Sequence, residues 1–310
     1  MFNQQLTDNS VKDYIHKVNY LSKIFLSKPL SSMMKEQLNV IFRIREDDFN
    51  IKDELEFINW SNEDLILKLK DKYKNKKTLI AYLNTLFILK RNLGVDTELL
   101  KEEIAKIGLE ISQERELNLQ MSDNLITFDN IDDNLNKLTD LKEKLIYALY
   151  MLIPARRLEY RFLTFLDGDC EECNNKDINW IYIKDKKIKF IFNEYKTKYK
   201  YKRQSFNFEN DKLIDILKEY INKYQIKGND LLFKSNKGTL MSYTQFGKLT
   251  TSIFSKIYNK KITVNDIRHS WANKVNEDIP KMTLREIMEI TNFMGHSVLE
   301  NLKYRRISQN

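Results

Sequence analysis

Hydrophobic side chains in the first third of the chain recur every three or four positions, which is the period of an amphipathic helix. In residues 10–27 the apolar positions are Val11, Tyr14, Ile15, Val18, Leu21 and Phe25. Cap and stop signals, such as Ser61 and Gly94, predict further helices at residues 61–72, 78–94 and 96 to about 111. Residues 1–115 are therefore expected to form a compact domain of four or five short helices.

The period is lost at residues 113–124, which are mostly polar. We place a linker at residues 116–124 and a second domain at residues 125–310. Helices are predicted there at residues 130–138, 141–152, 214–224, 243–257, 265–275 and 284–293. Between Trp180 and Phe208, strong β formers alternate with charged residues, which predicts a three-stranded antiparallel meander. The predicted fold class is mainly α with a small antiparallel β-sheet.

Length and composition agree with two helical domains. The chain has 310 residues, only 7 glycines and 3 prolines, and 31% charged residues, which excludes collagenous and linker-rich classes. No window approaches 18 consecutive apolar residues, and the start MFNQQLTDNS lacks the basic and apolar regions of a secretory signal. We expect a protein that neither spans a membrane nor is secreted.

The formal net charge of +8 is concentrated in short segments. Residues 184–203 hold nine cations against two acids, and residues 68–77 hold six lysines against Asp71. Tyrosines interleave with both clusters, a pattern that suits a polyanion, although a solvated face of a lysine-rich protein remains an alternative. The candidate DNA-binding residues are Lys72, Lys74, Lys76, Lys77, Lys198, Lys200, Lys202 and Arg203.

The sequence indicates no metal site and no cofactor. Cys170 and Cys173 form a lone CxxC, and none of the three histidines pairs with it at a spacing that a zinc site needs. Structural or incidental thiols are the favoured interpretation, with a metal or redox role as the alternative.

Three segments in the second half of the chain carry side chains that suit phosphate chemistry. IPARRLEY at residues 153–160 follows an apolar helix and holds two arginines, of which the first is Arg156. NDIRHSWA at residues 265–272 holds Arg268 near a helix start, and MGHS at residues 294–297 precedes Tyr304. A guanidinium fixed beyond an apolar helix can offer its planar fork to a phosphate.

Taken in order, these segments resemble the boxes of the tyrosine recombinase, or phage-type integrase, family over about half of the chain. In this register Arg156, not Arg157, is the arginine of the first box. The segment EYKTK at residues 194–198 is similar to the hairpin that bears the family lysine, which would be Lys196. The resemblance implies an N-terminal helical core-binding domain and a C-terminal DNA breaking-rejoining catalytic domain.

The resemblance also implies a role for each residue. Arg156 and Arg268 would clamp the scissile phosphate. Lys196 would protonate the departing 5′ oxygen, and His296 would donate a hydrogen bond or assist proton transfer. Tyr304 would be the nucleophile and form a 3′-phosphotyrosine. Fixed cations would meet the charge that develops on the phosphate, so the reaction would need neither metal nor ATP.

The chain departs from the family pattern at three places. Asn265 stands where many relatives have histidine; an amide can donate a hydrogen bond to the phosphate but cannot shuttle a proton, and it could instead cap its helix. The interval from His296 to Tyr304 is one residue shorter than in common bacterial members. Residues 305–310 are too few for the C-terminal helix that many relatives exchange between protomers.

Structural alternatives stay open for the site residues. Arg156 could form a surface salt bridge with Glu159, Arg268 could be a solvated helix residue, and His296 could be a core histidine. Tyr258 competes with Tyr304 as the nucleophile.

The expected partner is double-stranded DNA, held in a C-shaped clamp that the two domains form. A homotetramer assembled on paired DNA sites is expected, and no membrane partner. The bias toward Lys, Asn and Ile suits an A/T-rich genome, and the segments look similar to integrases of large DNA viruses and mobile elements. Such a protein would act in the cytoplasm, or in the nucleus or viral factory of a host cell. A type IB topoisomerase and a catalytically inactive DNA-binding relative are the alternative functions.

Overall fold

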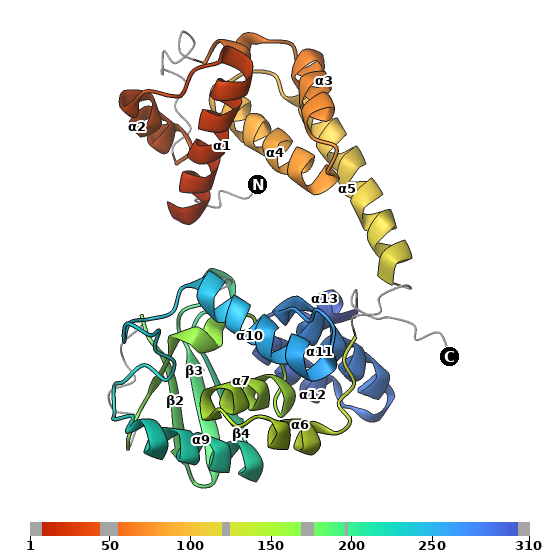
Figure 1. Cartoon of the computed structure of the whole chain (residues 1–310). Helices are drawn as coiled ribbons and strands as arrows, with labels where there is room; N and C mark the ends of the chain where they lie inside the picture. The colour runs from red at the N-terminus through yellow and green to blue at the C-terminus, as the bar shows by residue number, and fades with distance from the viewer. Residues whose placement is uncertain (1–7, 44–54, 120–124, 169–176, 196–197, 303–310) are drawn as a thin grey trace. The chain divides into compact units, whose positions relative to one another are not determined.

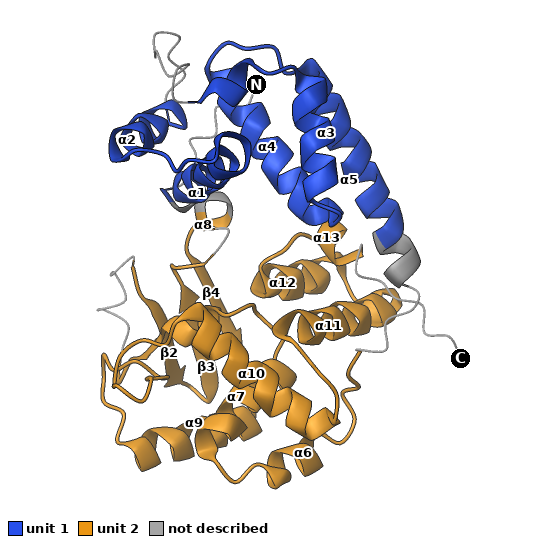
Figure 2. Cartoon of the chain, turned by 45° about the horizontal axis from the view of Figure 1, so that its top comes forward, with its two compact units in different colours: residues 1–118 blue, residues 119–310 orange. Residues whose placement is uncertain are grey.

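The computed structural model describes residues 8–43, 55–119, 125–168, 177–195 and 198–302. The chain divides into two compact units, residues 1–118 and 119–310 (Figures 1 and 2). Each unit has its own hydrophobic core. The domain boundary predicted after residue 115 stays a prediction, and the last helix of the first unit extends past residue 116, where the linker was expected to begin.

The first unit is helical throughout its described residues. Its helices are α1 (Asp8–Leu26), α2 (Ser32–Ile41), α3 (Asn62–Lys72), α4 (Lys76–Asn92) and α5 (Glu98–Leu119), with a 3-10 turn at Glu56–Asn59. Ser61 caps α3 as predicted, because its hydroxyl accepts a hydrogen bond from the Asp64 amide at 3.1 Å. Helix α4 begins before Thr78, where the sequence placed its start, because Asn75 is the capping residue and accepts from the Thr78 amide.

The second unit combines helices with one small sheet. Its helices are α6 (Ile131–Lys137), α7 (Leu141–Met151), α8 (Lys198–Tyr201), α9 (Asp211–Tyr224), α10 (Tyr243–Tyr258), α11 (Val264–Asp278), α12 (Leu284–Met294) and α13 (Val298–Leu302), with 3-10 turns at Glu159–Phe162 and Ile279–Lys281. The predicted helices are present. The mainly helical fold class is confirmed.

The sheet has four strands in the order β1-β2-β3-β4. They are β1 (Leu163–Phe165), β2 (Asn179–Lys184), β3 (Lys187–Phe192) and β4 (Gln204–Phe208). The predicted antiparallel meander is β2, β3 and β4, and β2 joins β3 through Asp185 and Lys186, whose positive φ angles of 51° and 58° suit a tight hairpin. The expectation of a purely antiparallel sheet was wrong, because β1 adds to β2 in parallel.

The basic connection between β3 and β4 also differs from the expected continuous hairpin. Residues Lys198–Tyr201 form the short helix α8, so Lys198 and Lys200 do not lie on a strand face. Lys196 lies outside the described residues.

Helix α7 forms the centre of this unit. Every residue from Leu145 to Met151 is buried, as expected for a helix covered on all sides. The ring of Tyr150 meets that of Tyr160 edge to face, with centroids 5.1 Å apart. The Trp271 indole donates a hydrogen bond to the Tyr150 carbonyl at 2.7 Å, which fixes α11 to the end of α7. The segment after α7 is therefore held on a rigid core.

Candidate active site

Arg156 is buried just beyond the end of α7, with 1% of its surface exposed. Its Nη1 donates to the Phe293 carbonyl at 2.6 Å and to Gln204 Oε1 at 3.3 Å. The guanidinium carbon lies 3.9 Å from the centroid of the Phe192 ring, which is a cation–π contact. The neighbouring Arg157 is exposed. The structure thus distinguishes the two arginines in the direction that the sequence register predicted.

Arg268 reaches the same place from α11. A capping box between Thr263 and Asp266 begins this helix. The Arg268 side chain is buried, and its Nη1 donates to the Met294 carbonyl at 2.6 Å and to the Ala155 carbonyl at 3.2 Å. Arg268 is therefore not a solvated helix residue.

The two guanidinium groups converge on the C-terminal end of α12. They bind the consecutive carbonyls of Phe293 and Met294, where a helix carries its partial negative charge. Gly295 ends the helix with a φ angle of 76°, a left-handed conformation that glycine adopts without strain. Figure 1 shows α11, α12 and α13 gathered at one end of the second unit. The site is thus built where these helices meet the segment after α7.

His296 follows that glycine and is buried. Its Nδ1 lies 3.2 Å from Nη2 of Arg268, and its Nε2 lies 3.0 Å from Oδ1 of Asn301. Arginine can only donate, so Nδ1 is the acceptor and Nε2 carries the proton. Burial, followed by the positive charge of Arg268, lowers the pKa of His296 to about 4. The imidazole is therefore neutral at pH 7.

The positive charge of Arg156 lacks a bound counter-charge in the described part of the chain. Glu159 is buried nearby and opposes the effect of burial, which lowers the pKa of Arg156. However, neither Oε2 of Glu159 nor Nε of Arg156 has a hydrogen-bond partner there. The expected alternative of a surface salt bridge with Glu159 does not describe this arginine. A buried cation without an ion pair is costly, and an anion bound beside it would lower that cost.

Asn265 lies on the exposed first turn of α11, three residues before Arg268 and so on the same side of the helix. The alternative that Asn265 caps this helix was wrong, because Thr263 is the cap and its side chain accepts from the Asp266 amide. Lys196 and Tyr304 lie outside the described residues. Their roles stay predictions.

The hydroxyl of Tyr258, the alternative candidate for the nucleophile, forms hydrogen bonds within the fold. This hydroxyl lies 3.3 Å from the Tyr147 hydroxyl and 3.4 Å from the Thr127 carbonyl. Burial raises the pKa of Tyr258, which makes its phenolate harder to form.

Several residues of the cluster were missed by sequence reasoning. They are Phe192, Tyr195, Gln204, Asn276, Phe293 and Asn301, which contact the arginines or the histidine or support those contacts. The sequence could have indicated Asn276, because it lies about two helical turns after Arg268 in the same helix and close to the same face. Gln204 and Asn301 had none, since tertiary contacts alone bring them to the cluster.

The candidate DNA-binding residues differ in their exposure and in whether they form ion pairs. In the second unit, Lys202 and Arg203 are exposed, whereas Lys198 forms an ion pair with Glu194. Lys200 lies in α8. The two exposed cations suit a phosphate contact best.

The candidate lysines of the first unit also differ in exposure and ion pairing. Lys72, Lys74 and Lys77 are exposed at the end of α3 and the start of α4, and Lys74 lies 3.5 Å from Asp71. Lys76 forms ion pairs with Glu110 at 2.6 Å and Glu114 at 2.7 Å, both on α5. Lys76 therefore joins two helices, which the charge count could not reveal.

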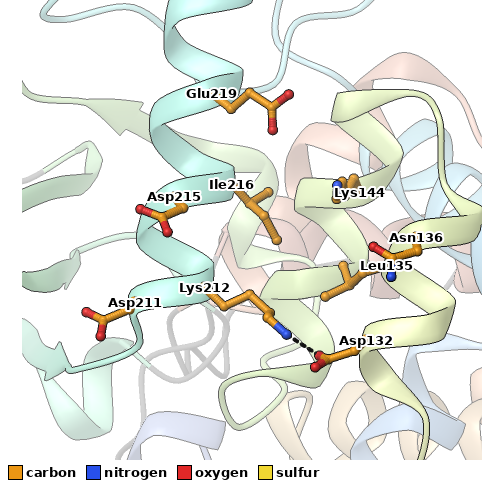
Figure 3. A pocket seen from close by; sticks show the side chains of 9 residues that line it. All are labelled: Asp132, Leu135, Asn136, Lys144, Asp211, Lys212, Asp215, Ile216 and Glu219. Carbon is orange, nitrogen blue, oxygen red and sulfur yellow. Dashed lines mark ion pairs between the residues drawn. The ribbon is translucent and has the colours of Figure 1, made fainter.

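A hollow of about 580 Å³ lies elsewhere in the second unit, between α6, α7 and α9 (Figure 3). Its charged lining residues are Asp132, Asp211, Asp215, Glu219, Lys144 and Lys212. Lys212 forms an ion pair with Asp132. The surplus of carboxylates over lysines in this lining would repel the phosphates of a nucleic acid.

Among the described residues, no group of three or more His, Cys, Asp or Glu side chains could hold a metal ion. Cys170 and Cys173 lie outside the described residues. No described helix is long and apolar enough to cross a membrane.

Comparisons with known proteins give limited information. No protein-family model matches the chain, and no curated protein matches its sequence. Among solved structures, the crystal structure of XerA recombinase matches with 13% sequence identity and a TM-score of 0.43, covering 96% of this chain and 95% of that one. A likeness this distant does not assign a family.

Proposed function

We propose that this chain is a site-specific DNA recombinase that cleaves and rejoins DNA strands through a 3′-phosphotyrosine, without metal or ATP. The observation that carries the proposal is the convergence of Arg156, Arg268 and His296, from three distant segments, on one end of α12. These are the residues that the resemblance to tyrosine recombinases selects. A chance resemblance would not require its three boxes to meet in space.

The chemistry of the cluster supports phosphoryl transfer. Attack on a phosphodiester builds negative charge on the non-bridging oxygens, and buried, preorganised cations stabilise that charge better than mobile ones. Carbonyls and aromatic rings hold the two guanidinium groups before any substrate arrives. Neutral His296 adds no charge but fixes Arg268 through its Nδ1.

In the proposed reaction, the Tyr304 hydroxyl attacks the scissile phosphorus, its proton passes to water, and the bond between phosphorus and the 5′ oxygen breaks. Lys196 gives a proton to that oxygen, and Asn265 donates a hydrogen bond to a phosphate oxygen from the first turn of α11. The tyrosine–phosphate bond conserves the energy of the broken ester, so the 5′ hydroxyl of another strand can reseal the DNA by the reverse steps.

The same proposal assigns the DNA contacts. Exposed Lys72, Lys74 and Lys77 in the first unit, and Lys202 and Arg203 in the second, would bind DNA phosphates. Recombination joins two cleaved duplexes, so a homotetramer on paired sites is proposed. The motif segments look similar to integrases of large DNA viruses and mobile elements, so we propose such a source, with action wherever that DNA lies, in cytoplasm, nucleus or viral factory.

Covalent capture tests the proposal. The full chain is incubated with nicked duplexes of randomised sequence in buffer containing EDTA, and DNA that stays attached to denatured protein is sequenced. The proposal predicts an enriched sequence attached through its 3′ phosphate. Adducts that form only after Mg²⁺ is restored, or no adduct with any sequence or with DNA of the source, would refute it.

A further inference from the structure

Helix α13 is held to the second unit in an unusual way. Asn301 is its buried residue, at 1% exposure, whereas Leu299 and Leu302 are 74% and 45% exposed. Hydrophobic burial therefore contributes little to its attachment. The polar contacts of the buried Asn301 side chain contribute to that attachment.

Asn301 makes those contacts in both directions. Its side-chain Nδ2 donates to Asn276 Oδ1 at 2.9 Å and to the Ala272 carbonyl at 3.4 Å. The backbone carbonyl of Asn301 accepts from Asn276 Nδ2 at 3.1 Å. Its Oδ1 faces Nε2 of His296 at 3.0 Å. Because Nδ2 is committed to acceptors on α11, Oδ1 must accept, and the hydrogen on the imidazole must be on Nε2.

The orientation of the Asn301 amide also determines how the imidazole of His296 binds Arg268. With its hydrogen on Nε2, the ring leaves a lone pair on Nδ1, and that lone pair accepts from Nη2 of Arg268. The other end of the guanidinium is bound by the carbonyls of Ala155 and Met294. One asparagine thus determines the hydrogen-bonding direction of a chain that ends at the proposed phosphate clamp.

We propose that Asn301 is a positioning residue for the DNA cleavage reaction: it holds His296 in the Nε2-protonated tautomer that orients Arg268, and it anchors α13, which directly precedes Tyr304 along the chain. The effect on cleavage rests on the proposed function. The tautomer is a property of the free protein and can be measured without DNA.

An aspartate at position 301 separates positioning from simple structural support. The groups that act on the His296 charge are Arg268 on α11, Glu300 on α13 and Arg157 after α7. Adding a carboxylate against Nε2 favours the charged imidazole, whose Nδ1 then donates and can no longer accept from Arg268. The Asn301→Asp variant should therefore be impaired most at low pH, where the imidazole is charged, and recover as the pH rises and the imidazole loses its proton.

The first measurement is the ¹⁵N NMR spectrum of the imidazole rings in the full chain, which has only three histidines. His296→Gln identifies the signal. The proposal predicts a neutral, Nε2-protonated ring at pH 7 in the wild-type protein and a higher pKa of His296 in Asn301→Asp than in wild type. A wild-type ring that is charged or protonated on Nδ1 at pH 7 would overturn the proposal, whether or not the protein cleaves DNA.

The second measurement is the pH profile of single-turnover cleavage on a captured DNA site. Asn301→Asp should be slower than wild type by about tenfold or more at the low end of the pH profile, and the deficit should shrink as the pH rises. The control is Asn273→Ala, which removes a buried asparagine side chain of α11 and should leave the shape of the pH profile unchanged. A loss in Asn301→Asp that is equal at every pH, or no loss, would overturn the positioning role. Absence of cleavage in the wild-type protein would instead refute the proposed function.

Discussion

Arg156 and Arg157 are adjacent in the sequence but have opposite environments, and this contrast supplies a matched pair of variants. Arg156→Ala should lower the single-turnover cleavage rate by several orders of magnitude, because a buried cation aimed at the transition state contributes about 3 to 5 kcal/mol. Arg268→Ala should have a loss of the same order. Arg157→Ala, which removes an exposed cation, is the control and should lose little. A tenfold loss or less for Arg156→Ala would show that Arg156 is peripheral.

Asn265 can now be tested without the ambiguity of capping, because Thr263 caps α11. Asn265→Ala should slow cleavage by about ten- to a thousandfold, the range for losing one hydrogen-bond donor to the transition state. Asn265→Asp should abolish cleavage, since its carboxylate would repel the phosphate, while the folded protein still binds DNA. Cleavage by Asn265→Asp at a near-normal rate would exclude a phosphate contact.

His296 should make stability depend on pH. Its pKa is about 4 in the folded protein and 6.5 in a free histidine, so the unfolded chain binds a proton in this interval and the folded protein does not. The free energy of unfolding therefore falls as the pH decreases from about 6.5 to about 4, by up to about 3 kcal/mol from this residue. Urea unfolding of His296→Gln should show a smaller decrease than wild type. The exposed His16→Gln is the control, and equal decreases in all three proteins would contradict the assigned burial.

The site residues that sequence could supply were those carried by local motifs. Arg156, Arg268, Gly295 and His296 stand in short segments whose residue types and order are informative. Asn301 and Gln204 could not be found in this way, because nothing in their neighbours distinguishes them. They belong to the site only because α13 and β4 pack beside the arginines.

At the scale of elements, the long helices were predictable because their hydrophobic period extends over several turns. The caps were partly predictable, as Ser61 shows. Strand β1 has three residues, all buried, so it offers no alternation to detect. Helices α8 and α13 are too short to display a period, and the basic composition of α8 resembled the strands beside it.

The lysines at the junction of α3 and α4 give a prediction at the same scale. Replacing Lys72, Lys74 and Lys77 together by alanine should flatten the slope of log K against log salt for DNA binding by about 0.9 for each lost phosphate contact. Lys76→Ala should leave the slope unchanged, because its ammonium is bound by Glu110 and Glu114. An unaltered slope in the triple variant would show that these lysines do not contact DNA.

At the scale of the whole molecule, the proposed reaction uses two units that have separate hydrophobic cores. The helical first unit offers exposed cations, and the second holds the buried arginine cluster. Composition alone indicated only a basic, mainly helical protein. The order of the motifs suggested the chemistry, and Arg156, Arg268 and His296 lie together where the proposed reaction would take place.

The central claim is that this location serves a tyrosine nucleophile, and the most direct measurement identifies the residue that carries the DNA. Captured adducts would be digested with nuclease and protease, and the modified peptide sequenced by mass spectrometry. We predict a phosphotyrosine at Tyr304, no adduct in Tyr304→Phe, and an undiminished adduct in Tyr258→Phe, whose hydroxyl is engaged within the fold. An adduct on any other residue, or an undiminished adduct in Tyr304→Phe, would contradict the account.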